Sequence, residues 1–175
     1  YGCMTQVDFS KLSPQMVWQH FETLCTIPRP SKHEQQLRQH LKNWAEQRNL
    51  DIYIDDIGNL IIRKAATAGK EQVAGVILQG HLDMVTQANS GTIHNFEQVP
   101  IRPILEDGWL VAKDTTLGAD NGIGVALALA VLESDDISHG PIEVLLTVDE
   151  EAGMSGARLL ESGVLKSKWL FNIDT

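Results

Sequence analysis

The spacing of apolar positions predicts two helices in the first fifty residues. Apolar side chains recur at helical intervals after Ser13 and Pro14, which we interpret as the N-cap and the first residue of a helix extending to about Ile27. Ser31 is predicted to cap a second helix, with Glu34 completing a capping box. The apolar face of that second helix is formed by Leu37, Leu41 and Trp44.

Short apolar runs bounded by turn residues predict strands in the rest of the chain. The expected strands cover residues 52–54, 60–63, 73–78, 142–148 and 169–173. A hairpin around Asp107 and Gly108 is expected to join strands at residues 101–105 and 109–112. Further helices are expected at residues 122–132 and, capped by Ser155, at residues 155–161. Helices that alternate with apolar strands favour one α/β domain, in which helices flank a largely parallel, mixed sheet.

Composition and charge narrow the possible partners. The chain has 23 acidic and 14 basic residues and a net charge of −9, so it lacks the basic surface that would neutralise a nucleic-acid backbone. Its longest apolar run, at residues 125–132, is too short to span a bilayer, and the first residues do not resemble a signal peptide. Cys3 and Cys25 form no CxxC pattern, which disfavours a disulfide framework. We expect a cytoplasmic protein that binds neither nucleic acid nor membrane.

Acidic residues and a histidine follow the ends of several predicted strands. In open α/β sheets, ligands bind outside the carboxyl ends of the strands, so side chains at these positions should lie close together. A further aspartate follows a glycine-rich turn and opens a helix. The candidate site residues are His81, Asp83, Asp120, Glu150, Glu151 and Asp174.

Each of these candidates also has a simpler interpretation. His81 and Asp83 are two residues apart, so on an extended chain both face the same way, and one could bind a metal ion while the other orients it. A structural histidine remains the alternative. Glu150 and Glu151 point in different directions, so one could bind a metal ion and the other handle a proton, unless both belong to a solvated charge run. Asp174 could be an ordinary strand-end residue.

The glycine-rich segment at residues 114–124 does not fit a nucleotide site. Gly118, Gly122 and Gly124 do not form GxGxxG, and the lysine of a phosphate-binding loop is missing. A structural glycine-rich helix start remains possible. Together, the carboxylates and the imidazole suit zinc, manganese or cobalt, and two ions close together form a known hydrolytic device. We interpret the other histidines as mostly surface residues: His20, His33, His40, His94 and His139.

Several of these segments resemble a known family. Residues 81–85, 116–124 and 147–153 resemble the M20 metallopeptidases, and among these the aminoacyl-histidine dipeptidases most closely. The run at residues 118–124 is the discriminating one, and residues 27–31 and 60–64 are similar too. The resemblance extends over nearly the whole chain from Leu12 onward.

The resemblance implies a role for each candidate residue. His81 and Asp174 would bind one metal ion, Glu151 would bind a second, and Asp120 would bridge both. The ions would be two divalent cations, with zinc favoured and cobalt or manganese as alternatives. The peptide bond after Asp120 is expected to be cis.

The remaining two candidates would act in catalysis. Glu150 would be the general base that activates the water, and Asp83 would orient His81. The implied reaction is hydrolysis of dipeptides with a C-terminal histidine, β-alanyl-histidine among them. A tripeptidase or an N-acyl amino acid deacylase of the same family is the alternative, and a metal-binding or interaction module is the non-enzymatic one.

The resemblance also bears on domain organisation. Residues 1–175 would form the N-terminal part of the catalytic domain. The lid and dimerisation domain and a further metal-binding histidine would lie in a longer protein, which is expected to be a homodimer. On this reading the 175-residue chain is inactive alone.

Overall fold

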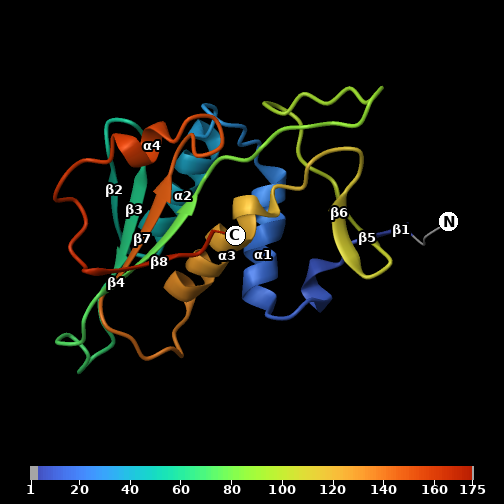
Figure 1. The fold of residues 1–175 in the computed structure, drawn as a ribbon. Helices are drawn as coiled ribbons and strands as arrows, with labels where there is room; N and C mark the ends of the chain where they lie inside the picture. Colours follow the sequence, from blue (N-terminus) through green and yellow to red (C-terminus); the bar gives the residue numbers. More distant parts are fainter. Residues whose placement is uncertain (1–3, 175) are drawn as a thin grey trace.

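The computed structural model describes residues 4–174, which form a five-stranded mixed sheet, three longer helices and a separate three-stranded sheet (Figure 1). The helices are α1 (Gln15–Thr26), α2 (Gln35–Gln47), α3 (Ala119–Glu133), the single-turn α4 (Ser155–Arg158) and the 3-10 helix η1 (Phe9–Lys11). The strands are β1 (Met4–Gln6), β2 (Asp51–Ile54), β3 (Leu60–Lys64), β4 (Val76–His81), β5 (Pro103–Glu106), β6 (Trp109–Ala112), β7 (Ile142–Thr147) and β8 (Trp169–Asn172).

The larger sheet has the strand order β2-β3-β7-β4-β8. Its β7, β4 and β8 are parallel, and β3 runs in the opposite direction to the other four strands. The predicted α/β fold with a largely parallel, mixed sheet is therefore confirmed. In the register of β4 and β7, His81 lies opposite Thr147, so both strands end at the same edge of the sheet.

The strand leading to His81 differs from the prediction. It begins at Val76 rather than at residue 73, and Val73 is 49% exposed. Gly80 and His81 are the last residues of β4 instead of following its end. The apolar run alone misplaced the strand because the polar and glycine residues at its end still pair with β7.

The predicted caps of three helices are wrong. Pro14 rather than Ser13 occupies the N-cap position of α1. The second helix begins at Gln35, and the Glu34 side chain makes no capping hydrogen bond. The last of the three, α4, ends at Arg158 instead of about residue 161, and the Ser155 hydroxyl donates a hydrogen bond to Asp149 Oδ2 at 2.6 Å.

The small sheet lies beside α1, on the side away from the large sheet (Figure 1). Its β5 and β6 are the hairpin that was predicted around Asp107 and Gly108. Its third strand, β1, pairs antiparallel with β5 and was not predicted.

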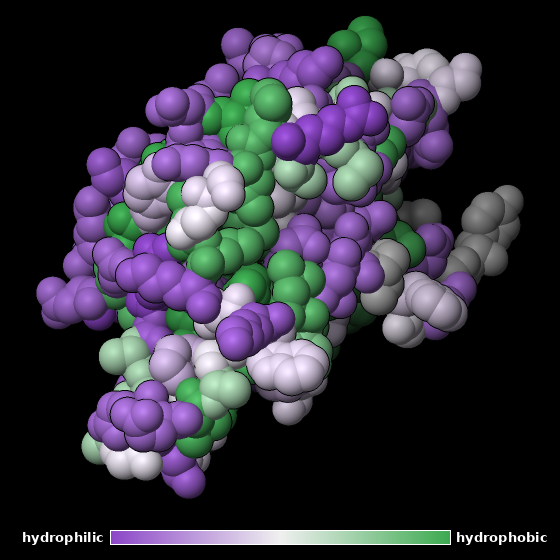
Figure 2. All heavy atoms as spheres, turned by 60° about the vertical axis from the view of Figure 1, so that its left-hand side comes forward, coloured by the Kyte–Doolittle hydropathy of each residue, from purple (hydrophilic) through white to green (hydrophobic). Residues whose placement is uncertain are grey.

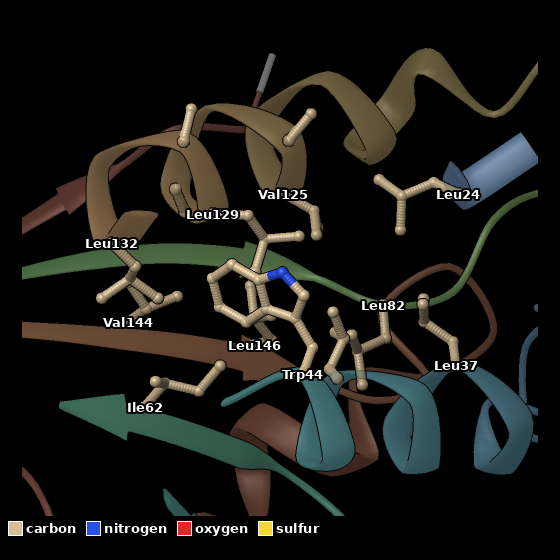
Figure 3. Packing of buried hydrophobic residues seen from close by; sticks show 14 of the residues in the cluster. Leu24, Leu37, Trp44, Ile62, Leu82, Val125, Leu129, Leu132, Val144 and Leu146 are labelled. Atoms are coloured by element: carbon tan, nitrogen blue, oxygen red, sulfur yellow. The ribbon is translucent and has the colours of Figure 1, made fainter. Parts of the chain in front are cut away.

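The hydrophobic core fills the space between the large sheet and the helices. Trp44 of α2 lies among Val125 and Leu129 of α3 and Val144 and Leu146 of β7 (Figure 3). The opposite face of the sheet has a smaller cluster, formed by Ile61, Ile77 and Leu145 and covered by Leu160, Val164 and Leu165. Burial on both faces explains why β7 reads as an apolar run.

The surface is mostly polar, with some exposed apolar groups. A band of apolar residues crosses the face shown in Figure 2. The edge strand β8 exposes Trp169, Leu170 and Phe171 by 64%, 48% and 55%. Within residues 4–174, every helix is too short or too polar to cross a membrane.

Two expectations about single residues can be compared with the structure. His20 is not a surface residue, because its side chain is 12% exposed and its Nε2 lies 2.6 Å from Glu133 Oε2. Cys25 is buried, and Cys3 lies outside the described residues.

Candidate metal centre

Five of the six candidate residues place carboxylate or imidazole groups around one point at the carboxyl edge of the large sheet. His81 ends β4, Glu150 and Glu151 follow β7, and Asp174 follows β8. Asp120 lies in the first turn of α3, where its backbone and that of the next residue are non-helical. The expected convergence is confirmed, and it arises because three parallel strands end at this edge.

Two groups of side chains could each hold a cation. In the first group, His81 Nε2 lies 3.0 Å from Asp120 Oδ1 and 3.6 Å from Asp174 Oδ2. The second group combines His81 with Glu150 and Glu151, and His81 Nε2 lies 3.9 Å from Glu150 Oε2. In each group, one ligand atom per residue lies within 4.8 Å of the others. His81 belongs to both groups, so the two sites would be adjacent.

The charges of this cluster favour a bound cation. Burial, followed by the negative charges of Asp120 and Glu150, raises the pKa of Glu151 above its ordinary value. Burial and a hydrogen bond with Asp120 raise the pKa of Asp174 in the same direction. A divalent cation between these carboxylates would offset their mutual repulsion. The donor set of carboxylate oxygens and one imidazole therefore fits zinc or a similar ion.

His81 is fully buried, and Asp83 fixes the direction of its ring. Its Nδ1 lies 2.9 Å from the Asp83 carbonyl oxygen and 3.3 Å from Asp83 Oδ1, which leaves Nε2 facing the other acids. Burial alone would favour the neutral ring. The hydrogen bond and charge of Asp83, followed by Asp120 and Asp174, instead raise the pKa of His81 to about 9.

Asp83 also connects two other segments to the site. Its carboxylate accepts hydrogen bonds from Ser31 Oγ at 2.6 Å and from the backbone amides of Glu150 at 3.0 Å and Glu151 at 3.1 Å. Burial alone would raise the pKa of Asp83, but the hydrogen bonds from His81, Ser31 and these amides lower it to about 2. Asp83 is therefore an ionised, buried acceptor that orders the site.

Asn121 is a residue of the site that was not predicted from the sequence. This residue is 2% exposed, and its Oδ1 accepts a hydrogen bond from the His81 amide at 3.2 Å. Its Nδ2 donates to the Ile173 carbonyl at 3.1 Å, directly before Asp174. The peptide bond between Asp120 and Asn121 is cis, as the family resemblance implied. One amide side chain thus connects the three segments of the first ligand group.

Two glycines, Gly80 and Gly124, are the sequence feature that could have indicated the buried side chain of Asn121. A Cβ atom at Gly80 would lie 2.3 Å from Asn121 Oδ1, and one at Gly124 would lie 2.6 Å from Asn121 Nδ2. Both positions must lack a side chain for the amide to fit. From the sequence, Gly124 indicated only a glycine-rich start of a helix.

Arg29 is the second residue that was missed. It is 2% exposed, and its Nη1 donates to the Leu82 carbonyl at 3.1 Å. Its Nη2 donates to the Gly118 carbonyl at 2.6 Å, and Gly118 has a φ of 79° in the turn before Asp120. Arg29 therefore connects the segment after His81 to the segment that carries Asp120.

Comparison with known proteins identifies relatives with the same fold. Residues 77–174 match the sequence model described as peptidase family M20/M25/M40. The cytosol non-specific dipeptidase of Escherichia coli (strain K12) is 49% identical over 168 residues, which are 96% of this chain and 35% of that protein. The crystal structure of an aminoacylhistidine dipeptidase from Vibrio alginolyticus matches with a TM-score of 0.94 and 54% identity.

These matches cover different shares of the proteins compared. The Vibrio alginolyticus match covers 97% of this chain and 34% of the other chain. A tripeptidase from Staphylococcus aureus matches with a TM-score of 0.77 and 26% identity, over 94% of this chain and 44% of the other. The chain spans about a third of the length of the two dipeptidases.

Proposed function

The chain belongs to peptidase family M20/M25/M40, and from this premise we propose that it carries the metal-binding and proton-transferring residues of a dipeptide hydrolase. One observation carries the proposal: ligand atoms of His81, Asp120 and Asp174 lie within 4.8 Å of one another, beside a second group that includes Glu150 and Glu151. Relatives at 49% and 54% identity are dipeptidases by name, which supports this class of reaction.

We assign the ligands as follows. His81, Asp120 and Asp174, whose ligand atoms lie within 4.8 Å of one another, would hold one divalent ion. Glu151 would hold a second, and Asp120, whose charge acts on Glu151, would contribute to both. Zinc fits this donor set, with cobalt and manganese as alternatives. When bound, two such ions polarise the scissile carbonyl and lower the pKa of the attacking water.

Glu150 acts as the general base in this proposal. Its carboxylate is 27% exposed, so it can reach a water molecule in the open part of the site. It accepts a proton from the attacking water and then donates that proton to the amine of the leaving amino acid. Because Asp83 accepts hydrogen bonds from the backbone amides of Glu150 and Glu151, both side chains start from a fixed backbone.

The proposed substrates are dipeptides with a C-terminal histidine, including β-alanyl-histidine. The name of the Vibrio alginolyticus relative supports this choice, and the name of the Escherichia coli relative supports a broader range of dipeptides. The tripeptidase relative, at 26% identity, makes tripeptide hydrolysis the second candidate. The cytoplasmic location and the homodimer stay predictions, the former supported by the name of the Escherichia coli relative.

The test is a panel of substrates, assayed with the zinc-loaded longer protein that contains residues 1–175. We expect hydrolysis of glycyl-histidine and β-alanyl-histidine, with slower cleavage of a tripeptide and of an N-acyl amino acid. Glu150→Gln should lower kcat by roughly 10²–10⁴-fold with zinc content unchanged, since it removes a general base. Glu151→Gln, the matched control, should lower zinc content instead.

Other outcomes would separate the alternatives. Faster cleavage of the tripeptide or the N-acyl substrate would assign the protein to a sister activity of the same family. Zinc binding without hydrolysis of any substrate would favour a metal-binding module. Loss of zinc from Glu150→Gln, with retention by Glu151→Gln, would exchange the roles of the two glutamates.

A further inference from the structure

We propose that Ser31 and Glu34 are positioning residues, which hold the turn that carries Glu150 and Glu151. The turn consists of residues 149–151 and follows β7. This inference rests on the proposed function, because it gives Glu150 and Glu151 their roles in proton transfer and metal binding. It adds the connection between α1 and α2 to the parts of the chain that build the site.

The turn is held by side-chain carboxylates at three successive backbone amides. The amide of Asp149 donates to Glu34 Oε1 at 2.7 Å. The next two amides, of Glu150 and Glu151, donate to the two oxygens of Asp83 at 3.0 and 3.1 Å. Hydrogen bonds to an ionised acceptor are short and strong. Glu34 and Asp83 thus fix the backbone from which both glutamate side chains extend.

The conformation of the turn explains why it needs such support. Asp149 has a φ of 55°, a left-handed conformation that is unfavourable for a residue with a Cβ atom. It is also 6% exposed, so water cannot readily replace Glu34 as the acceptor for its amide. In addition, the like charges of Glu150 and Glu151 repel each other. Without acceptors at its amides, the turn would adopt other conformations.

Ser31 acts one step further from the turn. Its hydroxyl donates to Asp83 Oδ2 at 2.6 Å, the same oxygen that accepts from the Glu151 amide. The connection between α1 and α2, which contains Ser31, is itself attached to the site, since the Met84 amide donates to the Arg29 carbonyl at 3.1 Å. Ser31 therefore holds the carboxylate of Asp83 in place, and that carboxylate in turn holds the backbone of residues 150 and 151.

The sequence pattern of Ser31 and Glu34 resembles a capping box, but neither side chain caps α2. Glu34 is 4% exposed and contacts a residue 115 positions away, and Ser31 contacts one 52 positions away. Burial of a carboxylate is unfavourable unless it has such partners. Both side chains therefore form hydrogen bonds to distant segments rather than to α2, and both sets of bonds support the turn at residues 149–151.

The experiment compares Glu34→Ala with Glu34→Gln, whose amide oxygen can still accept from the Asp149 amide. Gln36→Ala, at an exposed position of α2, is the control. Amide hydrogen exchange is measured for residues 149–151 and for β7 in the metal-free protein. Zinc affinity is measured by chelator competition. A merely structural role would lower the stability of the whole domain without a local change at the turn.

We expect Glu34→Ala to speed exchange at residues 149–151 by roughly tenfold, with β7 unchanged. Its affinity for the more weakly bound zinc ion should fall by roughly 10–100-fold, as for other residues that support metal ligands. Glu34→Gln and Gln36→Ala should resemble the wild type. Ser31→Ala, a milder change, should shift both readouts in the same direction by a smaller factor.

Two results would overturn the inference. One is unchanged exchange at residues 149–151 in Glu34→Ala and Ser31→Ala, and the other is faster exchange with unchanged zinc affinity. Absence of zinc from the wild type would instead count against the proposed function. The exchange rates would in that case decide alone whether Glu34 holds the turn.

Discussion

Asp83 stands outside both groups of possible metal ligands, yet it accepts hydrogen bonds from Ser31, from the turn at Glu150, and from the ring of His81 in its own segment. At the scale of single residues, the site depends on this ionised carboxylate. It orients the ring of His81, and it raises the pKa of that ring by its charge. In the proposed metal site, the same interaction would therefore set the geometry of the His81 ligand and make metal binding depend on pH.

The pKa of about 9 for His81 in the metal-free protein gives a prediction for zinc binding. Below this pH the ring carries a proton, which zinc must displace, because only the neutral imidazole is a ligand. Zinc affinity should therefore rise with pH up to about 9, by up to about tenfold per pH unit, and level off above it. Calorimetry at pH 7 in buffers of different ionisation enthalpy should detect about one proton released from His81 per protein chain when zinc binds.

Asp83→Asn is the control for this effect. It removes the charge that raises the pKa of His81, so fewer protons should be released on zinc binding at pH 7. No proton release from the wild type would contradict the assignment of His81 as a ligand. Equal release in both proteins would instead contradict the role of Asp83 in raising the pKa of His81.

At the scale of elements, α3 has two separate tasks. Its first turn presents Asp120 and Asn121 to the site, and its later turns pack against the sheet. Leu129 is 2% exposed and lies in the core, whereas Leu127 on the same helix is 44% exposed. The two leucines therefore provide a matched pair for measuring how core packing supports the element that carries Asp120.

We predict that Leu129→Ala lowers the free energy of unfolding by about 2–5 kcal/mol, because it removes buried methyl groups and leaves a cavity. Leu127→Ala should change it by no more than about 0.5 kcal/mol. Urea denaturation of both variants measures the difference. Equal destabilisation would mean that the core does not depend on this face of α3.

Elements could be predicted from the sequence where a local pattern decides them. The repeat of Leu37 and Leu41 in α2, and the apolar run of β7, each reflect burial of a face and gave the right element. Caps failed because a pattern such as Ser31 with Glu34 fits a local and a distant partner equally well. The three-residue β1 was missed because it is too short to show a period.

The site could be predicted in part for the same reason. Side chains that end strands are visible in the sequence, so His81, Glu150 and their neighbours were found together. Asn121 and Arg29 were missed because they act through hydrogen bonds to residues 40 to 89 positions away. Such partners depend on tertiary structure, and neither residue type by itself indicates that role.

At the scale of the whole molecule, topology and charge act together. Three parallel strands end at one edge and bring carboxylates of distant segments into one place, in a chain with a net charge of −9. That arrangement is unfavourable for the metal-free protein because the like charges repel one another. Bound cations would offset this repulsion, so metal binding and the stability of this edge should be linked.

The proposed function depends on this edge being a two-metal site that includes Asp120. The most direct test is zinc stoichiometry on chelator-stripped, zinc-reconstituted protein, comparing wild type, Asp120→Ala and the exposed control Asp136→Ala. We expect two zinc ions in the wild type and the control, and loss of zinc from Asp120→Ala. A wild type without zinc, or an Asp120→Ala variant that holds as much zinc as the wild type, would contradict it.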